Sequence, residues 1–245
     1  MSEGLLLLHA FPLDARMWHR QVATFSPLLP TVAPNLPGFG GTDLAGPVMT
    51  MAAAADRAIE AMDRAGLERA VVCGLSMGGY VSFELWRRAP ERFAGIVLAN
   101  TRAVPDSDDG AAARRALAER LRAEGTRVLV EQPPALLSAS ASDELHRWVR
   151  DTIADQPAEA LAAASLGMAE RPDSSPDLPR IDVPALVIAS TADALIPAEV
   201  SARMAEQIPG CELAIIEGAG HLSNLEAPDE FDRLLRGHLD RCHLQ

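Results

Sequence analysis

The fold of this chain is decided by the stretch AVVCGLSMGG, residues 70–79. An apolar run ends at Gly74, Ser76 follows within a Gly-x-Ser-x-Gly pattern, and residues 78–89 have a helical pattern. On a sharp turn between a strand and a helix, a serine is held in a strained backbone conformation. Glycines two positions away on each side are needed because a Cβ there would strike the neighbouring strand or helix. The stretch therefore predicts a nucleophile elbow with Ser76 as the nucleophile.

The rest of the chain alternates short apolar runs with helical patterns, which is typical of a parallel sheet covered by helices on both faces. The apolar runs predict six buried strands, at residues 5–9, 31–33, 70–74, 95–99, 185–190 and 212–216. Helices are predicted at residues 18–25, 51–65, 78–89, 198–207 and 229–240. The predicted fold class is therefore α/β, a doubly wound, mostly parallel sheet of about six strands.

Residues 105–180 interrupt this alternation. They contain helical patterns at 111–124, 143–154 and 158–168 with no apolar strand between them, and prolines lie at both boundaries. We expect a core formed by residues 1–104 and 181–245, with residues 105–180 inserted as a helical cap. A cap of this size can roof a pocket for small to medium, largely apolar acyl groups, but hardly a long channel.

The composition excludes several classes of function. With 34 acidic and 22 basic residues, the chain has a net charge of -12, which repels phosphate backbones and anionic lipid surfaces. Every basic residue is arginine, which excludes a Walker A phosphate loop, a Schiff base and a Ser-Lys dyad. The glycine-rich segment 36–42 has the spacing of neither a phosphate loop nor a dinucleotide site. We therefore expect no nucleic-acid partner and no membrane partner.

The cysteines indicate a reducing compartment. Cys73, Cys211 and Cys242 are an odd number at wide spacing, which suits neither a disulfide framework nor a zinc site. The apolar run 5–8 is too short to span a membrane, and Glu3 precedes it where a signal peptide would carry positive charge. We expect a cytoplasmic monomer or homodimer that needs no cofactor and no metal.

A serine hydroxyl becomes a good nucleophile only when an imidazole takes its proton. His221 is the best candidate for this base, because it lies in the loop 218–221, directly after the last predicted strand. His9 ends the first predicted strand, and we expect the turn 9–12 to engage it. The remaining histidines have charged neighbours or lie in the tail and are interpreted as solvated: His19, His146, His238 and His243.

The imidazolium needs a carboxylate to orient it, and after an elbow serine the usual chain order is serine, acid, histidine. Asp193 satisfies this order and follows the predicted strand 185–190. Glu217 is the alternative, although it is too close to His221 in the chain to reach the far ring nitrogen easily. Asn100 occupies the position after the preceding strand, where some hydrolases carry the acid.

The oxyanion of the tetrahedral intermediate must be stabilised by preorganised N–H donors. One comes from the residue after the nucleophile, Met77, and one from the loop after the first strand, where Phe11 is the candidate. The Phe11 side chain either walls the acyl pocket or packs in the core. Three residues of the cap segment either line a substrate cavity or pack the cap itself: Trp148, Leu136 and Leu137.

Four segments carry a resemblance to a known family: HAFP at 9–12, LPGFG at 36–40, GLSMGG at 74–79 and GAGHLSNLE at 218–226. With them, in this order, the chain resembles the α/β-hydrolase superfamily along nearly its whole length. The resemblance is strongest to a small-cap branch that includes 3-oxoadipate enol-lactonases, haloperoxidase-like esterases and carboxylesterases. It implies Ser76, Asp193 and His221 as nucleophile, acid and base. It also implies backbone oxyanion donors at Phe11 and Met77.

The chain departs from the family pattern in two places. Ala10 stands where the family usually has glycine, which would tighten the oxyanion loop without moving its backbone donors. The first predicted strand resembles the family's third strand, so we expect the fold to lack the usual N-terminal strand pair. We expect the sheet edge left in this way to need protection by other means.

These residues predict a hydrolase that cleaves a small to medium carboxylic ester, lactone or thioester through an acyl-enzyme. A serine at the elbow argues against haloalkane dehalogenase and epoxide hydrolase chemistry, which use a carboxylate nucleophile on a similar fold. Two alternatives stay open: a non-catalytic hydrolase-like binding protein, and a lyase or C–C hydrolase that reuses the triad.

Overall fold

A computed structural model describes residues 2–244 and contains a six-stranded sheet in which every neighbouring pair of strands is parallel. The strands are β1 (Glu3–Leu8), β2 (Thr31–Val32), β3 (Arg69–Leu75), β4 (Phe93–Ala99), β5 (Ala185–Ser190) and β6 (Glu212–Ile216). Their order in the sheet is β2-β1-β3-β4-β5-β6. The predicted α/β fold class is confirmed.

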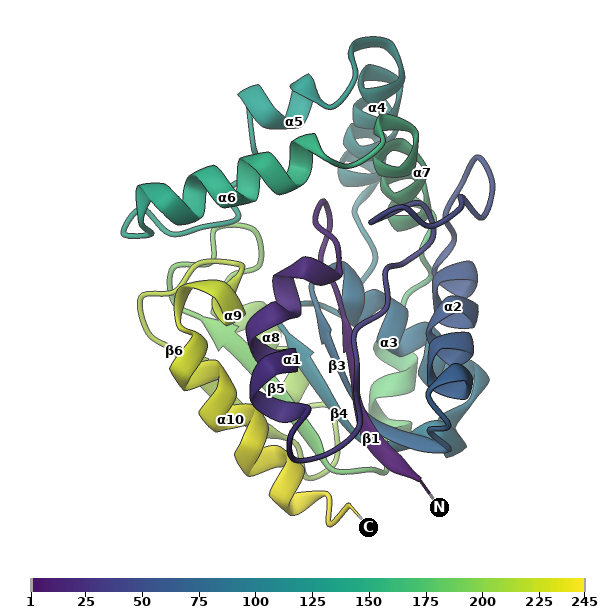
Figure 1. Ribbon diagram of the computed structural model, residues 1–245, viewed down its shortest axis with the longest axis vertical. Coiled ribbons are helices and arrows are strands. Elements are labelled where there is room, and N and C mark those ends of the chain that lie inside the picture. The colour runs from purple at the N-terminus through teal and green to yellow at the C-terminus, as the bar shows by residue number, and fades with distance from the viewer. Residues whose placement is uncertain (1, 245) are drawn as a thin grey trace.

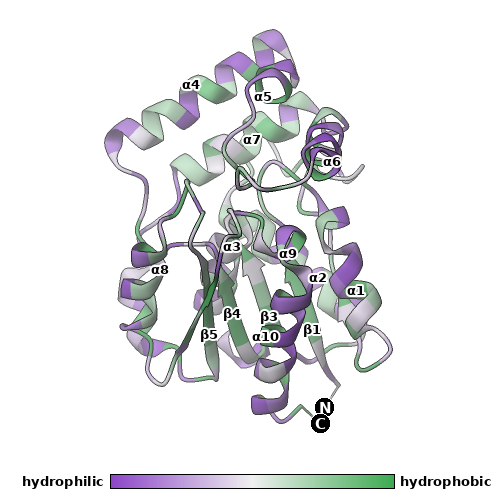
Figure 2. Cartoon of the chain, turned by 90° about the vertical axis from the view of Figure 1, so that its left-hand side faces the viewer, coloured by the Kyte–Doolittle hydropathy of each residue, from purple (hydrophilic) through white to green (hydrophobic). Residues whose placement is uncertain are grey.

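Helices cover both faces of this sheet (Figure 1). The flanking helices are α1 (His19–Phe25), α2 (Met51–Arg64), α3 (Met77–Arg88), α8 (Ala198–Ala205), α9 (Ser223–Glu226) and α10 (Pro228–Arg241). Helices α1 and α10 lie against one face, and α3 and α8 lie against the other, with α2 packed beside α3 (Figures 1 and 2). Short 3-10 turns lie at Ala15–Trp18, Pro90–Arg92 and Ser175–Arg180.

The central strands are apolar because they are buried on both faces. All six residues of β1 and all seven of β4 are buried. In Figure 2, the strands at the centre of the molecule are hydrophobic, and the helices around them have mixed hydropathy. The core therefore lies on the two sides of β1, β3, β4 and β5.

The two edge strands differ from the sequence-based expectation that every strand is buried. In β6, Leu213 is 42% exposed and Ile215 is 45% exposed. The expectation is wrong there because β6 has a neighbour on one side only and α8 packs mainly on β5. At the opposite edge, β2 has two residues, both half-buried. An edge strand this short offers little for another chain to pair with, which protects that edge.

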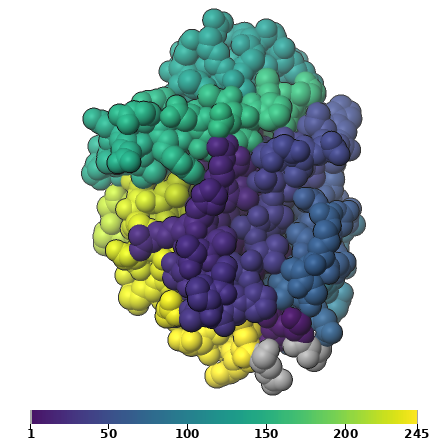
Figure 3. Space-filling view, in the orientation of Figure 1, coloured from purple at the N-terminus to yellow at the C-terminus, as the bar shows by residue number. Residues whose placement is uncertain are grey.

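The segment between β4 and β5 forms four further helices: α4 (Asp108–Glu124), α5 (Arg127–Glu131), α6 (Asp143–Ala154) and α7 (Ala158–Ala169). They lie together beyond the carboxyl ends of the strands, and in the space-filling view they form a continuous layer across that end of the molecule (Figures 1 and 3). Helix α5 was not expected from the sequence, because five residues are too few to show a helical period. The division into a core and a cap at residues 105–180 stays a prediction.

Side-chain caps explain where three helices begin. The hydroxyl of Thr50 accepts a hydrogen bond from Ala53 N at the start of α2. Ser107 and Ser142 do the same at the starts of α4 and α6. Each cap satisfies an amide that has no partner within its helix. Within residues 2–244, no helix has both the length and the apolar character to cross a membrane.

One histidine is placed differently from the expectation. His238 on α10 is 1% exposed, so its interpretation as a solvated residue is wrong. The ring lies against the start of β4, where its Nε2 atom is 3.2 Å from the position that a Cβ on Gly95 would occupy. Burial lowers the pKa of His238 to about 4.

Candidate active site

Ser76 lies on the turn between β3 and α3 with φ 55° and ψ -112°. A Cβ on Gly74 would come within 2.3 Å of the carbonyl oxygen of Gly78, and a Cβ on Gly78 would come within 2.1 Å of the carbonyl oxygen of Leu8 on β1. The close packing of the turn therefore requires both glycines, as the sequence predicts. The turn is tied to the next strand by a 2.9 Å hydrogen bond from Ser76 N to Ala99 O.

The loop after β6 brings His221 beside Asp193, which follows β5. The Nδ1 atom of His221 lies 2.8 Å from Oδ2 of Asp193, and both side chains are almost completely buried. The other carboxylate oxygen, Oδ1, accepts hydrogen bonds from the backbone amides of Leu195 and Ile196 at 2.9 and 3.0 Å. Burial acts to raise the pKa of Asp193, but the interaction with His221 and the hydrogen bonds from Ile196 and Asn100 together lower it. An ionised Asp193 directs the Nδ1 proton of the ring toward itself and leaves Nε2 free to accept a proton.

Asn100 completes this arrangement, in a role that the sequence did not reveal. Its Nδ2 atom donates to Oδ2 of Asp193 at 2.9 Å and to the hydroxyl of Ser190 at 3.0 Å. Its Oδ1 atom accepts a hydrogen bond from the hydroxyl of Ser223 at 2.6 Å. The residue adopts φ 44°, a conformation that asparagine tolerates better than most residues. The signal available in the sequence was its position directly after a buried strand, where some hydrolases carry the acid.

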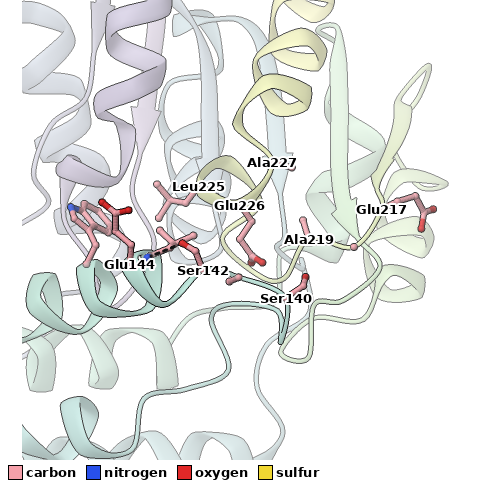
Figure 4. A pocket seen from close by; sticks show the side chains of 12 residues that line it. Ser140, Ser142, Glu144, Glu217, Ala219, Leu225, Glu226 and Ala227 are labelled. Carbon is pink, nitrogen blue, oxygen red and sulfur yellow. Dashed lines mark hydrogen bonds between the residues drawn. The ribbon is translucent and has the colours of Figure 1, made fainter.

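Glu217, the alternative acid, is exposed. Figure 4 shows it at the edge of a hollow, pointing away from Glu226 and Glu144. No hydrogen bond joins it to His221 among the described residues. The geometry therefore supports Asp193 as the partner of the imidazole.

Ser76 and His221 line one cavity of about 330 Å³. The apolar part of its wall consists of Phe11, Leu117, Leu129, Pro134, Leu136, Met168, Leu195 and Ile196. Leu136 is therefore at the cavity, and Phe11 lies on its wall as well as against the core. Trp148 and Leu137, for which the sequence left cavity lining and cap packing open, do not line this cavity. Trp148 lies at an outer hollow and Leu137 at another surface hollow.

The outer hollow that contains Trp148 is larger, at about 610 Å³, but it contains neither Ser76 nor His221. It lies between α6 and the loops around α9 (Figure 4). At its inner wall, Glu226 accepts hydrogen bonds from Gly220 N at 2.9 Å and from the amide and hydroxyl of Ser138. Glu226 thereby joins the loop of His221 to the segment between β4 and β5.

The two predicted oxyanion donors lie close to Ser76 in different ways: Phe11 lines the cavity with Ser76, and Met77 follows Ser76 in the chain as the first residue of α3. Among the described residues, the amides of Phe11 and Met77 have no hydrogen-bond acceptor. The Phe11 loop is held by the buried ring of His9, whose Nε2 accepts from Leu36 N at 3.0 Å and whose Nδ1 lies 3.2 Å from Ala10 O. Burial lowers the pKa of His9 to about 4, so the ring is neutral near pH 7. His9 is thus engaged in this loop, as expected.

Charged side chains also line the cavity, beside its apolar wall. Arg102, Asp106 and Arg114 belong to its wall. Arg102 follows the carboxyl end of β4, where ligands commonly bind in open α/β sheets, and this position was a signal available in the sequence.

The sheet order, the serine on its strand-to-helix turn and the helices over the carboxyl ends of the strands together define an α/β hydrolase. A sequence model of the alpha/beta hydrolase family matches residues 5–234, so the chain belongs to that family.

Several of the similar proteins are esterases or lactonases by name. The 3-oxoadipate enol-lactonase 1 of Acinetobacter baylyi is 29% identical, over 96% of this chain and 88% of that protein. A thermophilic esterase from Thermogutta terrifontis, solved with malate bound, superposes with a TM-score of 0.95 at 38% identity, over 99% of this chain and 91% of that one. The enol-lactonase of Burkholderia xenovorans gives a TM-score of 0.89 at 27% identity, over 98% and 92%. These similarities support ester or lactone hydrolysis.

Proposed function

We propose that this protein hydrolyses small to medium carboxylic esters, lactones or thioesters through a Ser76–His221–Asp193 triad. The observation that carries the proposal is that a strained serine and a carboxylate-bound imidazole open onto the same cavity. At about 330 Å³, this cavity is near the lower end of the range for small-molecule sites, which suits a small substrate.

In the proposed reaction, Nε2 of His221 takes the proton of the Ser76 hydroxyl while the Ser76 oxygen attacks the carbonyl carbon. The amides of Phe11 and Met77 donate to the resulting oxyanion. The imidazolium, stabilised by Asp193, then gives its proton to the departing alkoxide or thiolate, which leaves an acyl group on Ser76. Water, deprotonated by the same imidazole, releases the acid and restores the enzyme.

The segment 105–180 acts in this proposal as a cap. It contributes Leu117, Leu129 and Leu136 to the cavity wall, so it shapes the space in which the acyl group lies. The same proposal places the enzyme in the cytoplasm, where reducing conditions keep its three free cysteines unpaired.

The test is labelling with a fluorophosphonate probe followed by intact-mass analysis. We expect one adduct on the parent protein and none on Ser76→Ala. Ser140→Ala removes an exposed serine and is the control, so it should label like the parent. The same proteins are then assayed on 4-nitrophenyl esters, thioesters and lactones of graded acyl length.

An unlabelled parent protein would favour a hydrolase-like binding protein. Labelling that persists in Ser76→Ala would mean that another residue is the nucleophile. A labelled protein that hydrolyses none of these substrates but releases product by C–C cleavage or elimination would favour the lyase or C–C hydrolase alternative.

A further inference from the structure

Three arginines surround one aspartate in the wall of the cavity that contains Ser76. Asp106 accepts hydrogen bonds from Arg102 and Arg171 through Oδ1 and from Arg114 through Oδ2, and Arg171 also forms an ion pair with Oδ2. We call these four residues the arginine cluster. Three guanidinium groups face one carboxylate, so the cluster carries two positive charges in excess.

The arginine cluster is assembled from separate parts of the chain. Arg102 follows β4, Arg114 is on α4 and Arg171 follows α7. Arg102 and Arg114 line the cavity, with side chains that are 29% and 23% exposed. Arg171 stands behind them, 3% exposed, with its guanidinium 4.1 Å from the centre of the Tyr80 ring. Two of the three cations are therefore available to a ligand, and the third is structural.

Asp106 cannot balance this charge. Burial acts to raise its pKa, but Arg171 and Arg114 outweigh burial and lower the pKa to about 2, so the group remains a single anion at neutral pH. The wall of the cavity contains no second carboxylate among the described residues. The acids in the first turn of α4, Asp108 and Asp109, are exposed and form no ion pair with the cluster.

A purely structural role explains only part of the arginine cluster. The pair Asp106–Arg171 joins the two segments by which residues 105–180 leave and rejoin the sheet, and one buried pair is sufficient for that. Adding Arg102 and Arg114 leaves positive charge beside an apolar wall, which is unfavourable unless an anion compensates it. The buried Nε of Arg102 has no hydrogen-bond partner within residues 2–244, so this guanidinium retains an unused donor.

We propose that Arg102 and Arg114 bind a carboxylate of the substrate, so that the substrate class is a half-ester or a lactone derived from a dicarboxylic acid. This inference rests on the proposed function, because Ser76 attacks the ester or lactone carbonyl while the arginines hold the free carboxylate. Guanidinium groups suit this task because their planar donors match a carboxylate. The local positive charge also offsets the net charge of -12, which repels an anionic substrate from the protein as a whole.

The first experiment compares two substrates of equal acyl length, 4-nitrophenyl hydrogen glutarate and 4-nitrophenyl pentanoate. The parent should prefer the glutarate half-ester in kcat/KM, and salt should weaken this preference. In Arg114→Met, the ratio of the two kcat/KM values should fall about 10- to 100-fold, mainly through KM, as expected for the loss of a charge-assisted hydrogen bond. Arg120→Met changes an exposed arginine on the same helix and should keep the parent's ratio.

The second experiment measures binding without catalysis. Glutarate should bind to the Ser76→Ala protein in titration calorimetry, and the added Arg102→Met or Arg114→Met change should abolish binding in protein that remains folded by circular dichroism. The carboxylate assignment is overturned if glutarate does not bind, if inorganic phosphate binds better, or if the parent prefers the pentanoate ester. Failure of the proposed function gives a different result: the fluorophosphonate probe would not label Ser76, even if glutarate binds.

Discussion

The Nδ1 atom of His221 lies 2.8 Å from Oδ2 of Asp193, across a separation of 28 residues in the chain. The carboxylate is itself held in place, since its Oδ1 accepts from two backbone amides and its Oδ2 also accepts from Asn100. Each of these hydrogen bonds is therefore accepted by an oxygen of the ionised Asp193 carboxylate. The orientation of the imidazole is determined by three loops that follow β4, β5 and β6.

Replacement of Asp193 tests this relationship. In Asp193→Asn, the new amide nitrogen is a donor, and it would face either the backbone amides or His221 and Asn100, which are donors as well. The ring of His221 would then lose its orientation and its stabilising charge. We expect kcat to fall about 10²- to 10⁴-fold, since the same change in serine proteases lowers kcat about 10⁴-fold. Steady-state kinetics on the best ester of the panel provides the measurement.

Glu217→Gln is the matched control for Asp193→Asn, because Glu217 is exposed and lies in the same loop as His221. It should retain the activity of the parent. If Glu217→Gln loses activity while Asp193→Asn retains it, the acid has been assigned to the wrong residue.

Glu226 is expected to act as a positioning residue. Its carboxylate binds the amide of Gly220, beside His221, and both polar groups of Ser138. Glu226→Ala leaves these donors unsatisfied, so we expect the free energy of unfolding to fall by about 2 to 3 kcal/mol and kcat to fall about 10-fold. Urea unfolding and steady-state kinetics measure the two effects.

Glu144→Ala provides the comparison, because Glu144 lines the same outer hollow but is exposed (Figure 4). Glu144→Ala should leave both the free energy of unfolding and kcat close to those of the parent. If Glu226→Ala and Glu144→Ala have the same kcat and the same free energy of unfolding, Glu226 does not position the His221 loop.

Two helical glycines should respond in opposite ways to replacement by alanine, because Gly78 is tightly packed and Gly237 is not. A Cβ on Gly78 would lie 2.1 Å from the backbone oxygen of Leu8, which cannot move without disturbing the sheet. Gly78→Ala should therefore lower the free energy of unfolding by at least about 3 kcal/mol. Gly237, on α10, has open space around it, so Gly237→Ala should raise the free energy of unfolding by about 0.5 to 1 kcal/mol. A tolerated Gly78→Ala would contradict the described packing of the elbow.

The buried histidines make stability depend on pH. Burial lowers the pKa of both His9 and His238 from 6.5 to about 4. Between pH 6.5 and pH 4, these histidines bind protons in the unfolded chain but not in the folded chain. The free energy of unfolding therefore falls as the pH drops from about 6.5 toward 4, and the contribution of the histidines becomes constant below about pH 4. From pH 7 to pH 5 the expected loss is about 2 kcal/mol for each histidine.

Urea unfolding at pH 7, 6 and 5 measures this slope. His238→Gln should remove about half of it, whereas His19→Gln, which removes an exposed imidazole, should keep the slope of the parent. An unchanged slope in His238→Gln would mean that His238 is protonated in the folded protein.

The sequence by itself determined the features that depend on neighbouring residues. The apolar runs predicted β1, β3, β4 and β5, because a strand buried on both faces must be apolar throughout. The elbow was predicted from Gly74 and Gly78, because the turn demands them whatever surrounds it. The positions of Asp193 and His221 after β5 and β6 followed from the same strand pattern.

Only the tertiary structure decided which side chains meet across the fold. Local pattern could not show that Asn100 and Asp193 share a hydrogen bond, or that α4 brings Arg114 to Asp106 in the cavity of Ser76. Nor could it show that Leu136 lines this cavity while Trp148 does not. The physical reason is that these contacts depend on how distant helices and loops pack, whereas periodicity and turn chemistry act over a few residues of the chain.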